Sequence, residues 1–108
     1  MKTYELNELT RKQQNMGKPY LEFLRVSSMS MGLYRLPTAG IDLQSPHTED
    51  EVYYVVSGKA VIHVNGEDHP VQNGSIVYVA ANAPHQFHSI EQELEILVFF
   101  APAEHTQE

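Results

Sequence analysis

The sequence predicts an all-β fold, an antiparallel sandwich or barrel of short strands with one short helix at the N-terminus. Two observations carry this prediction. Short runs rich in β-branched and aromatic residues recur along the chain. Turn signals such as Asn65-Gly66 and Asn73-Gly74 separate these runs. A chain of 108 residues is long enough for one core, so we expect one domain, with the barrel over about residues 20–102.

The expected helix covers about residues 4–16. Apolar residues such as Leu6 and Leu9 recur there at helical spacing, although Gln13 interrupts the stripe. Gly17, with a proline shortly after it, signals the end of the helix. We expect this helix to pack across the outer surface of the barrel.

Strands are expected wherever β-branched and aromatic residues cluster. Tyr34 and Arg35 fall on opposite faces of one strand, and the sequence leaves open which of them faces inward. An inward Arg35 would imply an anionic substrate. A polar turn at residues 91–93 is expected between the last two strands. The expected strands are 20–26, 30–36, 52–56, 59–64, 76–79, 85–89 and 94–100, and residues 103–108 are expected to form a frayed tail.

Charge and composition exclude several classes of function. Fourteen acidic and seven basic residues give a net charge of −7, which disfavours nucleic acid and anionic membrane surfaces as partners. The chain has no cysteine, so it forms no disulfide and performs no thiolate chemistry. The N-terminus lacks an apolar signal core, and no apolar run approaches the length of a membrane span. We therefore expect a soluble cytoplasmic protein.

Two candidate metal ligands lie in one stretch. His47 and Glu51 are four residues apart and precede the strand-forming run of residues 52–56. A fully extended chain would separate their Cα atoms by roughly 13 Å, whereas donor atoms must approach a metal to about 2.1 Å. Pro46 and the polar residues after His47 favour a bend. The sequence therefore predicts that the chain bends between the two side chains.

His85 is the third candidate ligand. It follows a turn at Gly74, a short apolar run and an Ala/Asn/Pro loop. Two histidines and a carboxylate from different β segments can form a facial triad, which leaves open positions on the metal. Each residue has a simpler alternative. His85 would be a hydrogen-bonded histidine at the barrel mouth, His47 a histidine of a surface turn, and Glu51 a solvated carboxylate.

The stretch from Gly40 to Gly58 resembles the first motif of the cupin superfamily. That motif reads Gly, five residues, His-x-His, three or four residues, Glu, six residues, Gly. Here Ser45-Pro46-His47 occupies the His-x-His position, and Glu51 and Gly58 follow at the motif's spacing. The departures are Ser45 at the first histidine position and a gap after Gly40 that is one residue shorter.

Residues 74–89 resemble the second cupin motif, which reads Gly, five residues, Pro-x-Gly, two residues, His, three residues, Asn. This chain has Gly74, Ala80-Ala81-Asn82, His85 and Ser89 at the same spacing. The change to Asn82 is mild, because asparagine tolerates positive φ better than most residues.

The resemblance implies a double-stranded β-helix, the jelly-roll barrel of that superfamily, in agreement with the strand pattern. It implies one divalent transition metal (Fe, Mn, Ni or Zn) held by His47, Glu51 and His85. Ser45 would be a weak or water-mediated ligand, or only a spacer. The resemblance also implies a homodimer.

Tyr53 and Phe87 share a strand face with Glu51 and His85. They are expected to line a substrate pocket beside the metal, with simple core packing as the equal alternative. No separate catalytic residue is identified.

The other histidines are expected outside the site. His63 would be half-exposed or hydrogen-bonded, and His69 and His105 would be solvated. His88 would face outward, and it is the best substitute for the missing ligand.

The leading hypothesis is a metal-dependent small cupin that acts on a small organic molecule. The resemblance implies chemistry such as that of a dioxygenase, an isomerase or a decarboxylase. The alternative is a non-catalytic module that binds a sugar or another small ligand, a route that Ser45 in place of a histidine favours. A third hypothesis is a structural or partner-regulating protein with an empty barrel. Metal content separates the first hypothesis from the other two.

Overall fold

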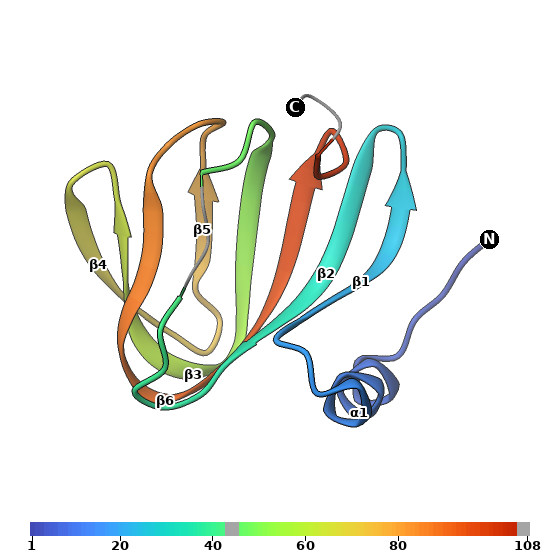
Figure 1. The fold of residues 1–108 in the computed structure, drawn as a ribbon, viewed down its shortest axis with the longest axis horizontal. Coiled ribbons are helices and arrows are strands. Elements are labelled where there is room, and N and C mark those ends of the chain that lie inside the picture. Colours follow the sequence, from blue (N-terminus) through green and yellow to red (C-terminus); the bar gives the residue numbers. More distant parts are fainter. Residues whose placement is uncertain (43–45, 106–108) are drawn as a thin grey trace.

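Figure 1 shows an antiparallel β-barrel with a helix beside its first strands. The computed structural model describes residues 1–42 and 46–105. All strand pairs are antiparallel, and the sheet order is β1-β2-β6-β3-β4, with β5 paired to β3. The predicted all-β class with a short N-terminal helix is confirmed. In chain order the elements are α1 (Leu6–Met16), β1 (Tyr20–Val26), β2 (Met29–Leu36), β3 (Asp50–Val64), β4 (Glu67–Gln72), β5 (Ile76–Val79) and β6 (His85–Ala101).

The two long strands β3 and β6 pair with each other along almost their whole length. Their ladder runs from Asp50 opposite Ala101 to Val64 opposite His85. Register shifts over residues 55–61 mark bulges, which bend a strand without ending it. In Figure 1 both strands bend so that the two ends of the ladder lie at the same end of the molecule.

Two of the predicted strand ends are wrong. The sequence predicted that a strand ends at Gly58 and that residues 91–93 form a turn, but β3 and β6 continue through these positions. Gly58 has φ +113°, and a Cβ there would lie 2.3 Å from the carbonyl oxygen of Glu93. A bulge at a close approach of two strands needs the same backbone freedom as a turn, so the same residue signals both.

The bend gives the sheet two layers, with the main core between them. One layer holds β1, β2 and β5 with the adjoining halves of β3 and β6, and the other holds β4 with the remaining halves. Inward side chains alternate with outward ones along each strand. The buried residues of this core are Tyr34, Leu36, Tyr53, Val55, Ala60, Ile62, Val71, Val79, Ala83, Phe87, Ile90, Leu94, Ile96, Val98 and Phe100.

Helix α1 covers a second, smaller apolar cluster that contains Leu9, Leu21 and Leu33. Gln13, which interrupts the apolar stripe, is buried, and its Nε2 donates to the carbonyl oxygens of Pro19 and Leu33 at 2.7 and 2.9 Å. This polar residue therefore anchors the helix to the barrel. Among the described residues, no helix has the length and apolar character needed to cross a bilayer.

Tyr34 and Arg35 face opposite sides of β2, and Tyr34 is the inward one. Its hydroxyl donates to Oδ1 of the buried Asp42 at 2.7 Å, and Oδ2 of Asp42 accepts from the backbone N–H of Phe87 at 2.9 Å. Arg35 instead forms ion pairs with two glutamates of β6. The argument for an anionic substrate through Arg35 therefore does not apply.

Candidate metal centre

The three side chains predicted as metal ligands lie together. Glu51 is on β3, His85 begins β6, and His47 precedes β3 outside any strand. Their donor atoms all lie within 4.8 Å of one another. Because β3 begins only at Asp50, the chain is free to bend after His47, as the spacing to Glu51 required. The backbone N–H of Asn82 holds this segment by donating to the carbonyl oxygen of His47 at 2.6 Å.

Glu51 and His85 form a buried pair that needs a cation. Each side chain is 1% exposed, and Nε2 of His85 lies 3.2 Å from Oε1 of Glu51. Nδ1 of His85 is 2.9 Å from the carbonyl oxygen of Ala83, which can only accept, so this nitrogen carries a proton. In the neutral imidazole the Nε2 lone pair would then face the carboxylate. Among the described residues, neither oxygen of Glu51 nor this Nε2 has a hydrogen bond of good geometry, which is costly for buried groups.

The pKa of His85 agrees with the requirement for a positive charge between His85 and Glu51. Burial alone lowers the pKa of His85, but the Glu51 carboxylate, the Ala83 carbonyl and Asp42 together raise that pKa above its ordinary value. Either a proton or a metal ion can therefore neutralise the pair. Two imidazoles and one carboxylate are donors that suit Fe, Mn, Ni or Zn. Two ligands on opposite sides of one ion are about 4.2 Å apart, so small side-chain rotations would bring these donors to a common ion.

A match to a known protein family agrees with the fold and with the arrangement of His47, Glu51 and His85. Residues 32–100 match the family model of the cupin domain, which covers more than half of the chain. The chain belongs to the cupin family.

Three known proteins are similar to this chain, two in sequence and one in fold. An uncharacterized protein of Streptomyces coelicolor is 47% identical over 104 residues, which cover 96% of this chain and 99% of that protein. The oxalate-binding protein of Thermotoga maritima is 33% identical over 55 residues, which cover 51% of this chain and 43% of that protein. A mutant salicylate 1,2-dioxygenase of Pseudoaminobacter salicylatoxidans, solved with gentisate, has a TM-score of 0.77 at 15% identity. That likeness covers 91% of this chain and 32% of the dioxygenase, and it shows the fold alone.

Two parts of the predicted cupin site stay predictions. Ser45, the expected weak or water-mediated ligand, lies outside the described residues. Tyr53 and Phe87 pack against each other with ring centroids 4.9 Å apart, and the Tyr53 ring is 6.1 Å from that of His85. They are 0% and 1% exposed and belong to the main core, so their role as pocket residues is still to be tested.

A cavity of about 260 Å³ adjoins His47, and sequence reasoning missed several of its lining residues. The Tyr20 hydroxyl is buried there, without a hydrogen-bond partner among the described residues. Its ring occupies the space that the absent side chain of Gly32 leaves on the neighbouring strand. Except for His47, the lining residues belong to neither cupin motif, so only the three-dimensional fold brings them to the site. The lining is Tyr20, Tyr34, His47, Phe100, Glu104 and His105.

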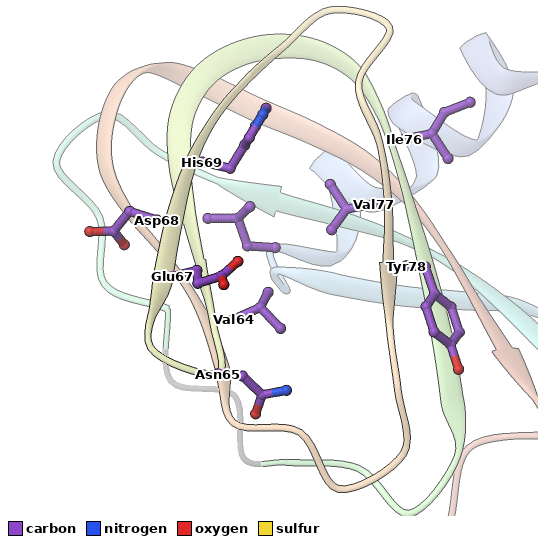
Figure 2. A pocket seen from close by; sticks show the side chains of 9 residues that line it. Val64, Asn65, Glu67, Asp68, His69, Ile76, Val77 and Tyr78 are labelled. Atoms are coloured by element: carbon purple, nitrogen blue, oxygen red, sulfur yellow. The ribbon is translucent and has the colours of Figure 1, made fainter.

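A larger hollow, about 550 Å³, lies elsewhere, between β4, β5 and the end of β3 (Figure 2). None of the three candidate ligands lines it. Figure 2 shows Asp68 pointing away from the other lining side chains, so the polar groups there do not converge. We therefore assign the metal centre from the donor geometry and not from the size of the hollow.

Three of the other histidines, His63, His69 and His88, lie away from the candidate ligands, whereas His105 lies beside His47, with ring centroids 6.3 Å apart. Nδ1 of His63 and Nε2 of His88 both contact Oδ1 of Asp68, at 2.8 and 2.9 Å, across strands β3, β6 and β4. His88 therefore does not replace the missing ligand. Glu49, between His47 and Glu51 in the sequence, is buried and accepts a hydrogen bond from the Thr48 hydroxyl.

Proposed function

We propose that this cupin binds one divalent transition metal through His47, Glu51 and His85 and presents it to a small organic molecule. The observation that carries the proposal is the buried Glu51–His85 pair, which a metal ion held together with His47 would neutralise. A bound metal would polarise the oxygen atoms of a ligand or an attacking water at its open positions.

The residues of the cavity beside His47 indicate the kind of molecule that it would take. Burial, followed by the nearby Glu104 carboxylate, raises the pKa of Tyr20 above its ordinary value, so its hydroxyl keeps its proton and acts as a donor. A buried donor and an aromatic wall from Phe100 suit a small ligand with carboxylate or hydroxyl oxygens. Dioxygenase-, isomerase- or decarboxylase-like turnover of such a compound is the enzymatic form of the proposal.

The second candidate function is binding of such a ligand, or of a sugar, without turnover. The relative from Thermotoga maritima that is called an oxalate-binding protein favours it. Both functions use the same three ligands. Product analysis after prolonged incubation of the metal-loaded protein with an organic acid separates them, because only the enzyme consumes its ligand.

Metal content of the untagged protein, purified without chelators, tests the proposal directly. We expect one transition metal per chain, either retained or restored by titration with Mn²⁺, Ni²⁺ or Zn²⁺. His85→Ala should abolish this binding, whereas His69→Ala should retain it, because the His69 side chain is exposed and its Nδ1 contacts the neighbouring Pro70 carbonyl. A wild-type protein that binds none of these ions would contradict the proposal.

The serine in the first motif gives a gain-of-function test. Ser45→His would restore the ligand type that the cupin motif has at this position. If the assigned motif register is right, this variant should bind the metal more tightly than the wild type. Unchanged affinity would show that residue 45 does not reach the ion.

A further inference from the structure

The last described residues of the chain fold back onto the barrel beside the metal centre. Ala103 is fully buried. The backbone N–H of Glu104 donates to Oγ of Ser30 at 3.0 Å, and its carbonyl oxygen accepts from Nη2 of Arg25 at 2.6 Å. Ser30 and Arg25 lie on β2 and β1. Part of the segment expected to fray is therefore held from two strands, as far as residue 104.

The side chain of Glu104 reaches the candidate ligand His47. Its Oε2 lies 3.3 Å from Nδ1 of His47, and the two side chains are only 14% and 12% exposed. Glu104 is not among the residues whose donor atoms all lie within 4.8 Å of one another, so its carboxylate contacts His47 without belonging to that cluster. In the neutral imidazole, a carboxylate beside Nδ1 favours the tautomer with the proton on Nδ1, and Nε2 is then the nitrogen that can bind a metal.

His85 is arranged in the same way. Its Nδ1 donates to the Ala83 carbonyl, and its Nε2 faces Glu51. The two histidines differ in their backbone support, because His85 begins β6 whereas His47 lies outside any strand. The orientation of the His47 ring therefore depends more on side-chain contacts, such as those with Glu104 and Phe100.

We propose that Glu104 is a positioning residue of the metal centre, which orients His47 and keeps the proton on Nδ1 so that Nε2 binds the ion. This inference rests on the proposed function, since it requires a metal at His47, Glu51 and His85. The C-terminal segment would thus support a site that lacks the first histidine of the motif. Partners of this kind typically contribute about 10- to 100-fold to metal affinity.

The first measurement is the Zn²⁺ affinity of the full chain, by competition with a chelating dye. We expect Glu104→Ala to weaken binding about 10- to 100-fold. Glu104→Gln should lose less, because its amide oxygen can still accept a hydrogen bond from Nδ1. The matched control is Glu91→Ala, which removes an exposed glutamate paired with Lys59 and should bind like the wild type. Equal thermal midpoints of the metal-free proteins would exclude a folding defect.

The second measurement is NMR of the ring nitrogens in the zinc-loaded protein with isotope-labelled histidine. The wild type and Glu104→Gln should show His47 with Nδ1 protonated and Nε2 bound to zinc. Glu104→Ala should lose this single form. A residue that merely stabilised the fold would leave the ring nitrogens of His47 unchanged, so this signal isolates positioning from stability.

The outcomes distinguish a failure of the inferred role of Glu104 from a failure of the proposed metal-binding function. If the wild type binds no zinc, or His85→Ala binds as tightly as the wild type, the proposed function fails. If only His85→Ala loses zinc, while Glu104→Ala matches the wild type in affinity and in its His47 signals, the metal centre is supported and the role of Glu104 is wrong. A Glu104→Gln variant as weak as Glu104→Ala would also overturn this role, because direct ligation by the carboxylate would explain it better.

Discussion

At the scale of single residues, Asp42 joins two strands through one buried carboxylate. Its oxygens accept from the Tyr34 hydroxyl on β2 and from the backbone N–H of Phe87 on β6. Tyr34→Phe keeps the ring and removes one hydrogen bond to this carboxylate. We expect the free energy of unfolding to fall by about 1.5–3 kcal/mol, measured by urea denaturation.

The control for this substitution is Tyr78→Phe. The Tyr78 hydroxyl also contacts an aspartate, Oδ1 of Asp50 at 3.2 Å, but this contact is exposed to solvent. Its removal should change stability little. If the two variants are equally stable, burial of the Asp42 contact does not strengthen it, and the prediction is wrong.

Asp68 provides a pH-dependent contact on the outer face. Hydrogen bonds from His88 and then His63 hold the pKa of this carboxyl below its ordinary value. The contact therefore contributes stability above the pKa that Asp68 has in the unfolded chain, and the contribution disappears as the pH falls through the lower, folded value. In an NMR titration of the carboxyl, His88→Asn should raise the pKa of Asp68 toward its ordinary value. His69→Asn should leave that pKa unchanged, and equal values in both variants would contradict the assignment.

At the scale of elements, Gly58 is where β3 bends against β6. Gly58→Ala would add strain at φ +113° and place a Cβ 2.3 Å from the Glu93 carbonyl oxygen. We expect a loss of more than about 3 kcal/mol in urea denaturation, because overpacking and backbone strain add. Gly66, at φ +84°, has nothing within 4 Å of such a Cβ. Gly66→Ala should therefore cost only about 1–2 kcal/mol, the strain alone. Equal losses would mean that the close approach at Gly58 does not matter.

The sequence predicted the positions of most strands, but not whether a strand continues through a bend. Clusters of β-branched and aromatic residues predicted most strands, and residues 20–26 and 76–79 have the predicted bounds. The continuous paths of β3 and β6 were missed, because Gly58 and the polar residues 91–93 have the composition of a turn whether the chain reverses or bends.

The candidate site also contains residues that the sequence predicted and a residue that it did not. Motif spacing singled out His47, Glu51 and His85, since fixed offsets along strands determine which side chains can meet. Glu104 has no such offset to His47. Their contact depends on how the C-terminal segment crosses the ends of β1 and β2, which is a property of the folded chain. Sequence patterns therefore predicted the three candidate ligands but not Glu104, which contacts one of them.

At the scale of the whole molecule, an apolar surface supports the homodimer that the cupin resemblance implies. Tyr54 and Ile76 are cross-strand partners on β3 and β5, and they are 39% and 71% exposed. Tyr78, further along the same face of β5, is 62% exposed. Such patches often mark contacts between proteins. We expect a dimer in sedimentation analysis at micromolar concentration, and Ile76→Glu should convert it to a monomer.

The matched control for the dimer is Ile41→Glu. Ile41 is equally exposed, at 73%, but it lies outside the strands. This variant should remain a dimer. A monomeric wild type, or loss of the dimer in both variants, would count against an interface on β3 and β5.

The curved β3–β6 ladder has a consequence for the order of events in folding. Glu51 and His85 belong to opposite ends of that ladder, yet their side chains are 3.2 Å apart. Pairing between strands far apart in sequence is slow, and the two residues can meet only after the ladder has formed and closed on itself. A metal ion would then have no complete site in the transition state. We expect added Zn²⁺ to leave the refolding rate unchanged and to slow unfolding in stopped-flow experiments. The ion would lengthen the lifetime of the closed barrel without helping it to form.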